Sequence, residues 1–241
     1  MNTAGRHIIG EIIGTAILVF LGCGSVAYSN LVNPLSLILI ASIWGIAVAL
    51  AIYVSRKWSY AHLNPAVSLG FFVGKEVDVK SLVAHLFGQV VGATLAAIIL
   101  FFVFQSRLVS GSITEAMAFG EYYPNPGSGI KELSTLHAVL FEGMGTFILM
   151  MGILWIIRIK KKNIHPILIG FLLAVLIIII APYTQAGFNP ARDALPRFVS
   201  YIGGYEMAYS HNGWGNVLVY VIAPIIGAMA AILLFKKIKR A

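Results

Sequence analysis

The sequence predicts an all-helical membrane protein with six spanning helices and two short helices that enter the membrane without crossing it. Three observations support this prediction. First, 59% of the 241 residues are hydrophobic and 11% are charged, whereas a soluble domain carries about 25% charged residues. Second, six apolar stretches are long enough to span a bilayer. Third, the tripeptide Asn-Pro-Ala occurs twice, each time after an apolar segment.

The six predicted spans follow one another with short connections, except around the two tripeptides and one longer loop. Each is an uninterrupted apolar run that helical geometry extends across the hydrocarbon core. Their expected positions are 7–28, 35–55, 81–104, 134–157, 164–182 and 215–235.

Each Asn-Pro-Ala tripeptide predicts the start of a helix, because Asn is a favoured N-cap and Pro a favoured first residue. The helix after Asn64 should run over 67–73 and that after Asn189 over 191–199. At ~1.5 Å per residue each is about 12 Å long, under half of a hydrocarbon core of about 30 Å. The alternative is a pair of ordinary capped helices in surface loops.

The Lys and Arg residues predict the orientation of the chain, because they gather on the cytoplasmic side of membrane proteins. With both termini inside, thirteen of the 17 fall on the inner side and four on the outer side. We therefore expect cytoplasmic termini in a multi-pass protein of the plasma membrane. The net charge of +8 is explained by this topology, so nucleic-acid binding is not expected.

The two halves of the chain repeat one pattern. Glu11-Ile12-Ile13-Gly14-Thr15 matches Glu142-Gly143-Met144-Gly145-Thr146, and a glycine lies 19 residues before each Asn, at Gly45 and Gly170. Three spans make one repeat, so the second copy enters the membrane from the opposite side. We expect one domain over 1–241, with repeats at about 1–110 and 134–241 joined by the external loop 105–133.

Inversion gives the two tripeptides a joint role. Short helices that enter from opposite faces can meet near the midplane, where irregular backbone is tolerated beside protein or a water-filled cavity. Their N-termini, with Asn64 and Asn189, would then face each other at the middle of a pore. Both positive dipole ends would point at the same place.

Two carboxylates fall inside apolar spans, where charge is costly and usually faces the interior. Glu11 and Glu142 could form a proton or cation relay. The alternative is structural: each carboxylate accepts hydrogen bonds from backbone N–H groups in the loop before a short helix. The equivalence of the two residues in the repeat favours the structural role.

Arg192 follows the second tripeptide directly and keeps its charge when buried. It would donate hydrogen bonds to a solute and repel cations; the alternative is a surface arginine paired with Asp193. His62 is expected to be a hydrogen-bonded residue of the inner pore wall. The sequence contains no His or Cys spacing for a metal, no catalytic constellation and no phosphate loop, so we expect no enzyme activity and no cofactor.

At these motifs the sequence resembles the aquaporin superfamily, and within it the glycerol facilitators (aquaglyceroporins). The resemblance covers nearly the whole chain. The Asp after the filter arginine and Arg197 four residues later are typical of glycerol facilitators. The motifs that carry it are Ala61-His62-Leu63-Asn64-Pro65-Ala66-Val67, Gly88-Gln89-Val90-Val91-Gly92-Ala93, Tyr123-Pro124-Asn125-Pro126 and Asn189-Pro190-Ala191-Arg192-Asp193.

The resemblance implies a homotetramer with one pore per subunit and an outer constriction around Arg192. By position, Trp44, Ile177 and Ala186 would complete this constriction, and Leu63 and Phe188 would line the pore beside the asparagines. Facilitators usually carry glycine and phenylalanine where this chain has Ile177 and Ala186. In the sixth span, Tyr220 stands where facilitators tend to have proline.

The resemblance and the residues together predict a passive channel for small uncharged solutes, glycerol and water first, that excludes ions and protons. An alternative is a broader channel for neutral solutes such as hydrogen peroxide, undissociated lactic acid and dihydroxyacetone, with glycerol not the main one. A secondary transporter and a structural membrane protein are the rival classes. A transporter would need a coupling site, which only Glu11 and Glu142 could offer.

Overall fold

The computed structural model describes residues 3–108 and 111–240 and is all-helical over that part of the chain. Six helical segments of the described chain are long and apolar enough to cross a membrane. All six predicted spans are present, with ends within a few residues of those expected. The long helices are α1 (Thr3–Leu31), α2 (Leu37–Ser55), α4 (Val79–Phe104), α6 (Thr135–Ile156), α7 (His165–Thr184) and α11 (Ala223–Arg240).

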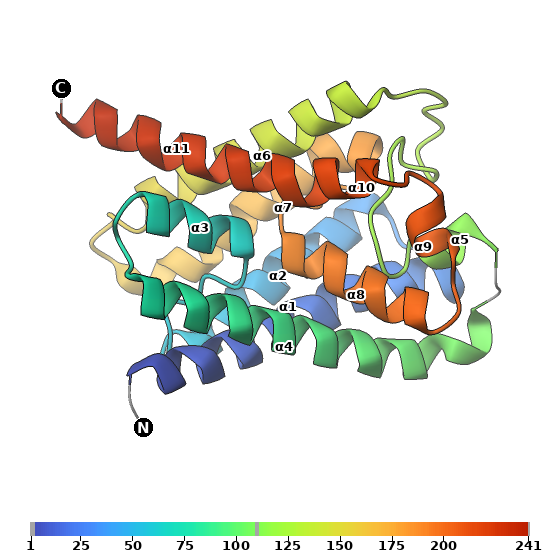
Figure 1. The fold of residues 1–241 in the computed structure, drawn as a ribbon, viewed down its shortest axis with the longest axis horizontal. Helices are drawn as coiled ribbons and strands as arrows, with labels where there is room; N and C mark the ends of the chain where they lie inside the picture. Colours follow the sequence, from blue (N-terminus) through green and yellow to red (C-terminus); the bar gives the residue numbers. More distant parts are fainter. Residues whose placement is uncertain (1–2, 109–110, 241) are drawn as a thin grey trace.

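Two short helices, α3 (Pro65–Val73) and α8 (Pro190–Ile202), lie between the long ones with their N-terminal ends toward each other at the centre (Figure 1). Both begin at the Pro of an Asn-Pro-Ala tripeptide. The first turn of α1 and the last turn of α11 lie at the same end of the molecule (Figure 1). This is the expected architecture of six spans and two inverted half-helices.

Helix α8 is longer than its predicted 191–199, because its stop signal is Gly203 rather than the residues after Val199. It continues through Pro196, whose missing N–H leaves the carbonyl of Arg192 without its usual helical partner. The thiol of Cys23, on α1, lies 3.7 Å from that carbonyl oxygen and donates to it. A residue from another span therefore completes the hydrogen bonding of this half-helix.

Glycines let the long helices pack with backbones in contact, as small residues do in membrane bundles. A Cβ added at Gly92 of α4 would overlap the carbonyl oxygen of Ile12 in α1. The second half repeats this contact, with Gly227 of α11 against the carbonyl of Gly143 in α6. Gly45 of α2 and Gly170 of α7 meet each other in the same way.

The remaining elements are short, and two of them, α10 and η3, form the first part of the sixth span. The π-helix η3 holds the fully buried Tyr220 at the start of the sixth span. Such π-turns often occur at functional sites. The short elements are η1 (Gln105–Arg107), α5 (Ile113–Ala116), η2 (Lys162–Ile164), α9 (Met207–Ser210), α10 (Gly215–Val217) and η3 (Leu218–Ile222).

Candidate functional site

The two asparagines form a reciprocal pair at the centre of the molecule. Asn64 Oδ1 accepts from the backbone N–H of Ala66 at 2.8 Å, and Asn189 Oδ1 accepts from Ala191 at 3.0 Å, so each caps its own half-helix. Each amide nitrogen also donates across the pair. Asn64 Nδ2 donates to the carbonyl of Phe188 at 2.9 Å, and Asn189 Nδ2 to that of Leu63 at 2.8 Å. A primary amide has a second N–H, which each asparagine retains for a solute.

Glu11 holds the loop before α3. Its carboxylate accepts from the backbone N–H groups of His62 at 2.9 Å and Leu63 at 2.7 Å. Ser59 Oγ at 2.9 Å and Gln89 Nε2 at 2.8 Å complete its partners. A fully buried carboxylate with four donors is a fixed structural acceptor rather than a free proton carrier.

Glu142 does the same for the loop before α8. It accepts from the backbone N–H groups of Gly187 at 2.9 Å and Phe188 at 2.8 Å, and from Thr184 Oγ1 at 2.5 Å. The two carboxylates therefore have equivalent geometry in the two halves. This geometry agrees with a structural role for Glu11 and Glu142, in which each carboxylate accepts hydrogen bonds from backbone N–H groups in the loop before a short helix.

The loops that these carboxylates hold are strained. Leu63 has φ 54°, Ala186 φ 61° and Phe188 φ 52°, in the left-handed region that residues other than glycine rarely adopt. Such backbone costs of order 1–3 kcal/mol per residue and persists only when neighbours fix it. In this left-handed conformation the carbonyl of Leu63 faces Asn189, and the carbonyl of Phe188 faces Asn64.

His62 lies half-buried on the wall of a cavity that also reaches Asn64. Its Nδ1 is 3.1 Å from Ser68 Oγ, and its ring stacks on Phe71 with 4.7 Å between centroids. Gln89 Nε2 donates to the same Ser68 Oγ at 2.9 Å. The histidine is thus a hydrogen-bonded wall residue.

The four residues expected at the outer constriction line one cavity together: Trp44, Ile177, Ala186 and Arg192. Each is at most 4% exposed. The guanidinium carbon of Arg192 lies 4.3 Å from the centroid of a Trp44 ring, within the range of a cation–π contact. Trp44 can lie there because Gly22 of α1 leaves room for its ring.

Arg192 has a partner that the sequence did not reveal. Its guanidinium forms an ion pair with Glu121, and both side chains are nearly fully buried. Glu121 lies in the loop 105–133, three residues before Pro124, where a carboxylate is ordinarily exposed to solvent. No local pattern distinguishes it from Glu115 or Glu132 in the same loop, so only the tertiary structure identifies it.

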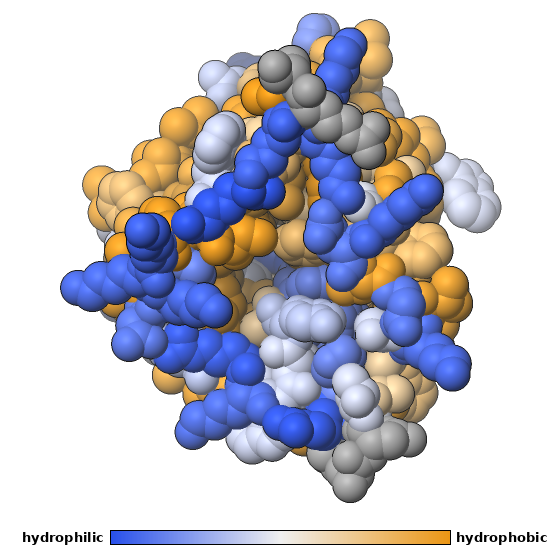
Figure 2. All heavy atoms as spheres, turned by 90° about the vertical axis from the view of Figure 1, so that its left-hand side faces the viewer, coloured by the Kyte–Doolittle hydropathy of each residue, from blue (hydrophilic) through white to orange (hydrophobic). Residues whose placement is uncertain are grey.

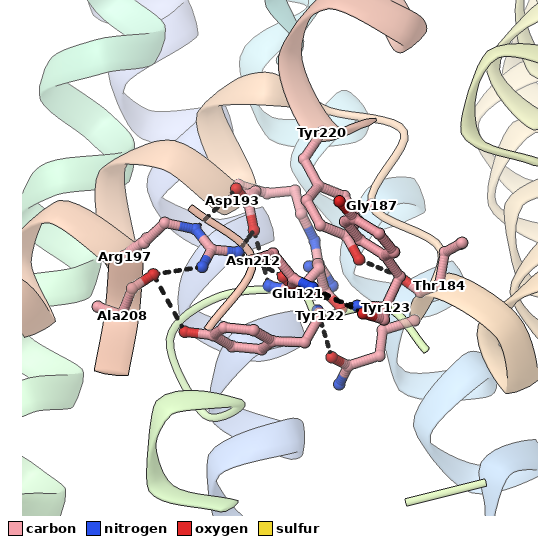
Figure 3. A network of polar contacts seen from close by, with 12 residues as sticks. Glu121, Tyr122, Tyr123, Thr184, Gly187, Asp193, Arg197, Ala208, Asn212 and Tyr220 are labelled. Carbon is pink, nitrogen blue, oxygen red and sulfur yellow. Dashed lines mark hydrogen bonds and ion pairs between the residues drawn. The ribbon is translucent and has the colours of Figure 1, made fainter. Parts of the chain in front are cut away.

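Asp193 pairs with Arg197 one turn later on α8, at 2.8 Å, and not with Arg192. The surface-pair alternative for Arg192 is therefore wrong. Arg197 also donates to the carbonyl of Ala208 at 2.5 Å, and Tyr122 donates to the same oxygen at 3.2 Å (Figure 3). Burial raises the pKa of Tyr122 to about 12, so its hydroxyl remains a neutral donor.

A single cavity of about 810 Å³ joins these groups. It runs from Lys57 and Lys162 at one mouth, past both asparagines, to Arg192. Figure 2 looks at the face that carries the first turn of α1 and the last turns of α11, and shows hydrophilic side chains around a hollow. Much of its lining is aliphatic or aromatic; the apolar residues include Leu18, Trp44, Val48, Ile52, Leu149, Ile153, Leu173 and Ile177.

Comparison with known proteins places the chain in a family. A family model described as "Major intrinsic protein" matches residues 2–235. The "Glycerol uptake facilitator protein" of Haemophilus influenzae is 32% identical, over 96% of this chain and 92% of its own length. "Aquaporin AqpM" of Methanothermobacter thermautotrophicus is 31% identical, over 98% of both chains.

A solved structure supports the same relationship. The X-ray structure of the aquaglyceroporin from Plasmodium falciparum superposes with a TM-score of 0.85 at 27% sequence identity, covering 98% of this chain and 97% of that one. The match extends over the six long helices and both half-helices, because it spans almost the whole of each chain. With the family model and the curated relatives, it leads to one conclusion: this chain belongs to the major intrinsic protein family.

Proposed function

We propose that this protein is a passive membrane channel for small uncharged solutes, with glycerol and water as its main solutes. The observation that carries the proposal is the cavity that connects Lys57 and Lys162 at one mouth with Trp44 and Arg192, past the paired asparagines. Relatives named glycerol uptake facilitator support glycerol as a solute.

The lining of this cavity suits a polyol, because it contains both apolar and hydrogen-bonding side chains. The carbon edge of glycerol can lie against Trp44 and Ile177, while its hydroxyls meet hydrogen-bonding groups. Arg192 and the free N–H groups of Asn64 and Asn189 donate. Residues 60–63 and 186–188 line the same cavity. A neutral solute can exchange its hydration for these groups one at a time, with no coupled ion.

The assembly and orientation belong to the same proposal. We expect one channel domain per chain, built from repeats at about 1–110 and 134–241, and a homotetramer in the plasma membrane with cytoplasmic termini. Large apolar side chains such as Ile38 and Phe171, 66% and 68% exposed, support burial of these helix faces in lipid or against other subunits. Nothing in the proposed transport requires an enzyme activity or a cofactor.

The broader solute range concerns the same pore. Ala186 contributes only a methyl group to the constriction, and Ile177 contributes an aliphatic side chain in place of a flat ring. This composition supports passage of hydrogen peroxide, undissociated lactic acid and dihydroxyacetone beside glycerol. The names of the relatives favour glycerol and water as the principal solutes.

Stopped-flow light scattering of proteoliposomes tests the proposal. We expect permeability to water and glycerol to exceed that of protein-free vesicles of the same lipid. Hydrogen peroxide and lactic acid at low pH form the second series, since they test the breadth of the pore. Glycerol permeability equal to that of the empty vesicles, with folded protein present, would contradict the proposal.

A further inference from the structure

The positive charge of Arg192 is balanced by a neighbouring carboxylate, that of Glu121. Its guanidinium faces the Trp44 ring on one side and forms an ion pair with the Glu121 carboxylate on another. The two paired side chains are 4% and 5% exposed, so solvent counterions do not share the pair. Coulomb interactions are strong at such buried positions, and a matched pair has a much weaker field than either charge alone.

Glu121 is held in place from behind by a second ion pair. Its backbone N–H donates to Asp193 Oδ1 at 2.7 Å, and Arg197 donates to its carbonyl oxygen (Figure 3). Arg197 and Asp193 form their own pair at 2.8 Å and are 1% and 2% exposed. The loop can pass this close because residue 120 is glycine: a Cβ there would lie 2.8 Å from the guanidinium carbon of Arg197.

The second pair adds no net charge to the constriction, since Arg197 and Asp193 cancel each other. The charge that a solute meets is therefore set by Arg192 and Glu121 together. Deeper in the cavity, the N-termini of α3 and α8 point their positive dipole ends at the centre, which favours anions. An unpaired arginine above these dipoles would complete a path for anions.

We propose that Glu121 is a specificity-determining residue: its carboxylate cancels the charge of Arg192, so that the constriction offers hydrogen-bond donors without a net charge. The channel then excludes anions as well as cations, and cation exclusion does not depend on a free positive charge at Arg192. This inference rests on the proposed function, because it assumes that solutes pass Arg192.

Four variants with matched changes in charge test the inference. The summed charge of residues 121 and 192 is +1 in Glu121→Gln, −1 in Arg192→Gln and zero in the double variant. Glu132→Gln, at an exposed position of the same external loop, is the control for removing a carboxylate. Each is reconstituted, and chloride, potassium and proton permeabilities are measured from the voltage across vesicles with salt or pH gradients. Glycerol flux is measured in the same vesicles.

For Glu121→Gln we expect chloride permeability to rise about tenfold, equivalent to about 1.4 kcal/mol of barrier. For Arg192→Gln we expect potassium or proton permeability to rise instead. The double variant and Glu132→Gln should remain as impermeable to ions as the unmodified protein.

Two results would overturn the inference. One is a folded Glu121→Gln that is as impermeable to chloride as the unmodified protein. The other is a double variant that leaks cations like Arg192→Gln, which would show that the charge of Arg192 is itself the cation barrier. If the unpaired arginine prevents Glu121→Gln from folding, the comparison of Arg192→Gln with the double variant still tests the inference. It shows whether cation leakage requires the unpaired carboxylate of Glu121. Absence of glycerol flux through the unmodified protein would contradict the proposed function. The ion permeabilities of the variants test only the role of Glu121.

Discussion

The side chain of Asn189 performs two tasks at once, because it caps α8 and also donates to the carbonyl of Leu63. Asn64 does the same from the other half. Both tasks follow from one amide, whose oxygen accepts while its nitrogen donates. The sequence predicted that the two residues meet, but the crosswise bonds depend on the strained loops, which no local pattern reveals.

Replacement of Asn189 by leucine should therefore destabilise the protein through the loss of two interactions. Loss of the cap costs about 1 kcal/mol. The carbonyl of Leu63 loses its partner, which costs about 1–3 kcal/mol more for a buried group. We expect lost glycerol flux and a lower thermal unfolding temperature in detergent. Asn33→Leu, in an exposed turn, is the control. Normal flux through folded Asn189→Leu would contradict the role of the pair.

Ala186 should set the breadth of solute selection. Phenylalanine at this position places a ring in the constriction opposite Ile177, and Phe188 already shows that an aromatic residue tolerates positive φ in this loop. We expect Ala186→Phe to reduce the passage of dihydroxyacetone and lactic acid more than that of water, measured as permeability ratios in the same vesicles. An equal fractional loss for all solutes would mean that Ala186 does not line the filter.

At the scale of elements, the loops before α3 and α8 depend on buried carboxylates. The apolar runs predicted the long helices, since a bilayer leaves few other structures for such segments. The Asn-Pro pairs predicted the starts of the half-helices correctly. The end of α8 was predicted too early, because the helix continues past Val199 to its C-cap at Gly203. Burial of Glu121 depends on the packing of the loop 105–133 on α8, so the sequence could not predict it.

Glu142→Gln should destabilise the loop before α8. The carboxylate accepts from three donors at once, whereas a glutamine amide replaces one acceptor oxygen by a nitrogen that cannot accept. At least one buried N–H or hydroxyl loses its partner, at about 1–3 kcal/mol. We expect a lower unfolding temperature and reduced glycerol flux, with Glu132→Gln unchanged. An unaffected Glu142→Gln would mean that the carboxylate does not hold this loop.

At the scale of the whole molecule, the distribution of Lys and Arg predicts which face is cytoplasmic. The protein has one cysteine, Cys23, and it is buried, so engineered cysteines can be labelled without background. Lys131→Cys and Lys161→Cys introduce the same change at exposed positions on the two predicted sides. A membrane-impermeant maleimide should label Lys131→Cys in intact cells, and Lys161→Cys only after permeabilisation. The reverse labelling pattern would show that the predicted orientation of the chain in the membrane is wrong.

Transport by this protein should be passive, and the response of glycerol uptake to a proton gradient tests this. Radiolabelled glycerol uptake into proteoliposomes is followed with and without an imposed proton gradient. Because the carboxylates of Glu11 and Glu142 are fully engaged by the loops, they offer no site for coupling. We predict that internal glycerol rises to the external concentration and no further, at the same rate with the gradient or with an uncoupler. Accumulation above the external concentration, abolished by the uncoupler, would show that transport is coupled to protons and not passive.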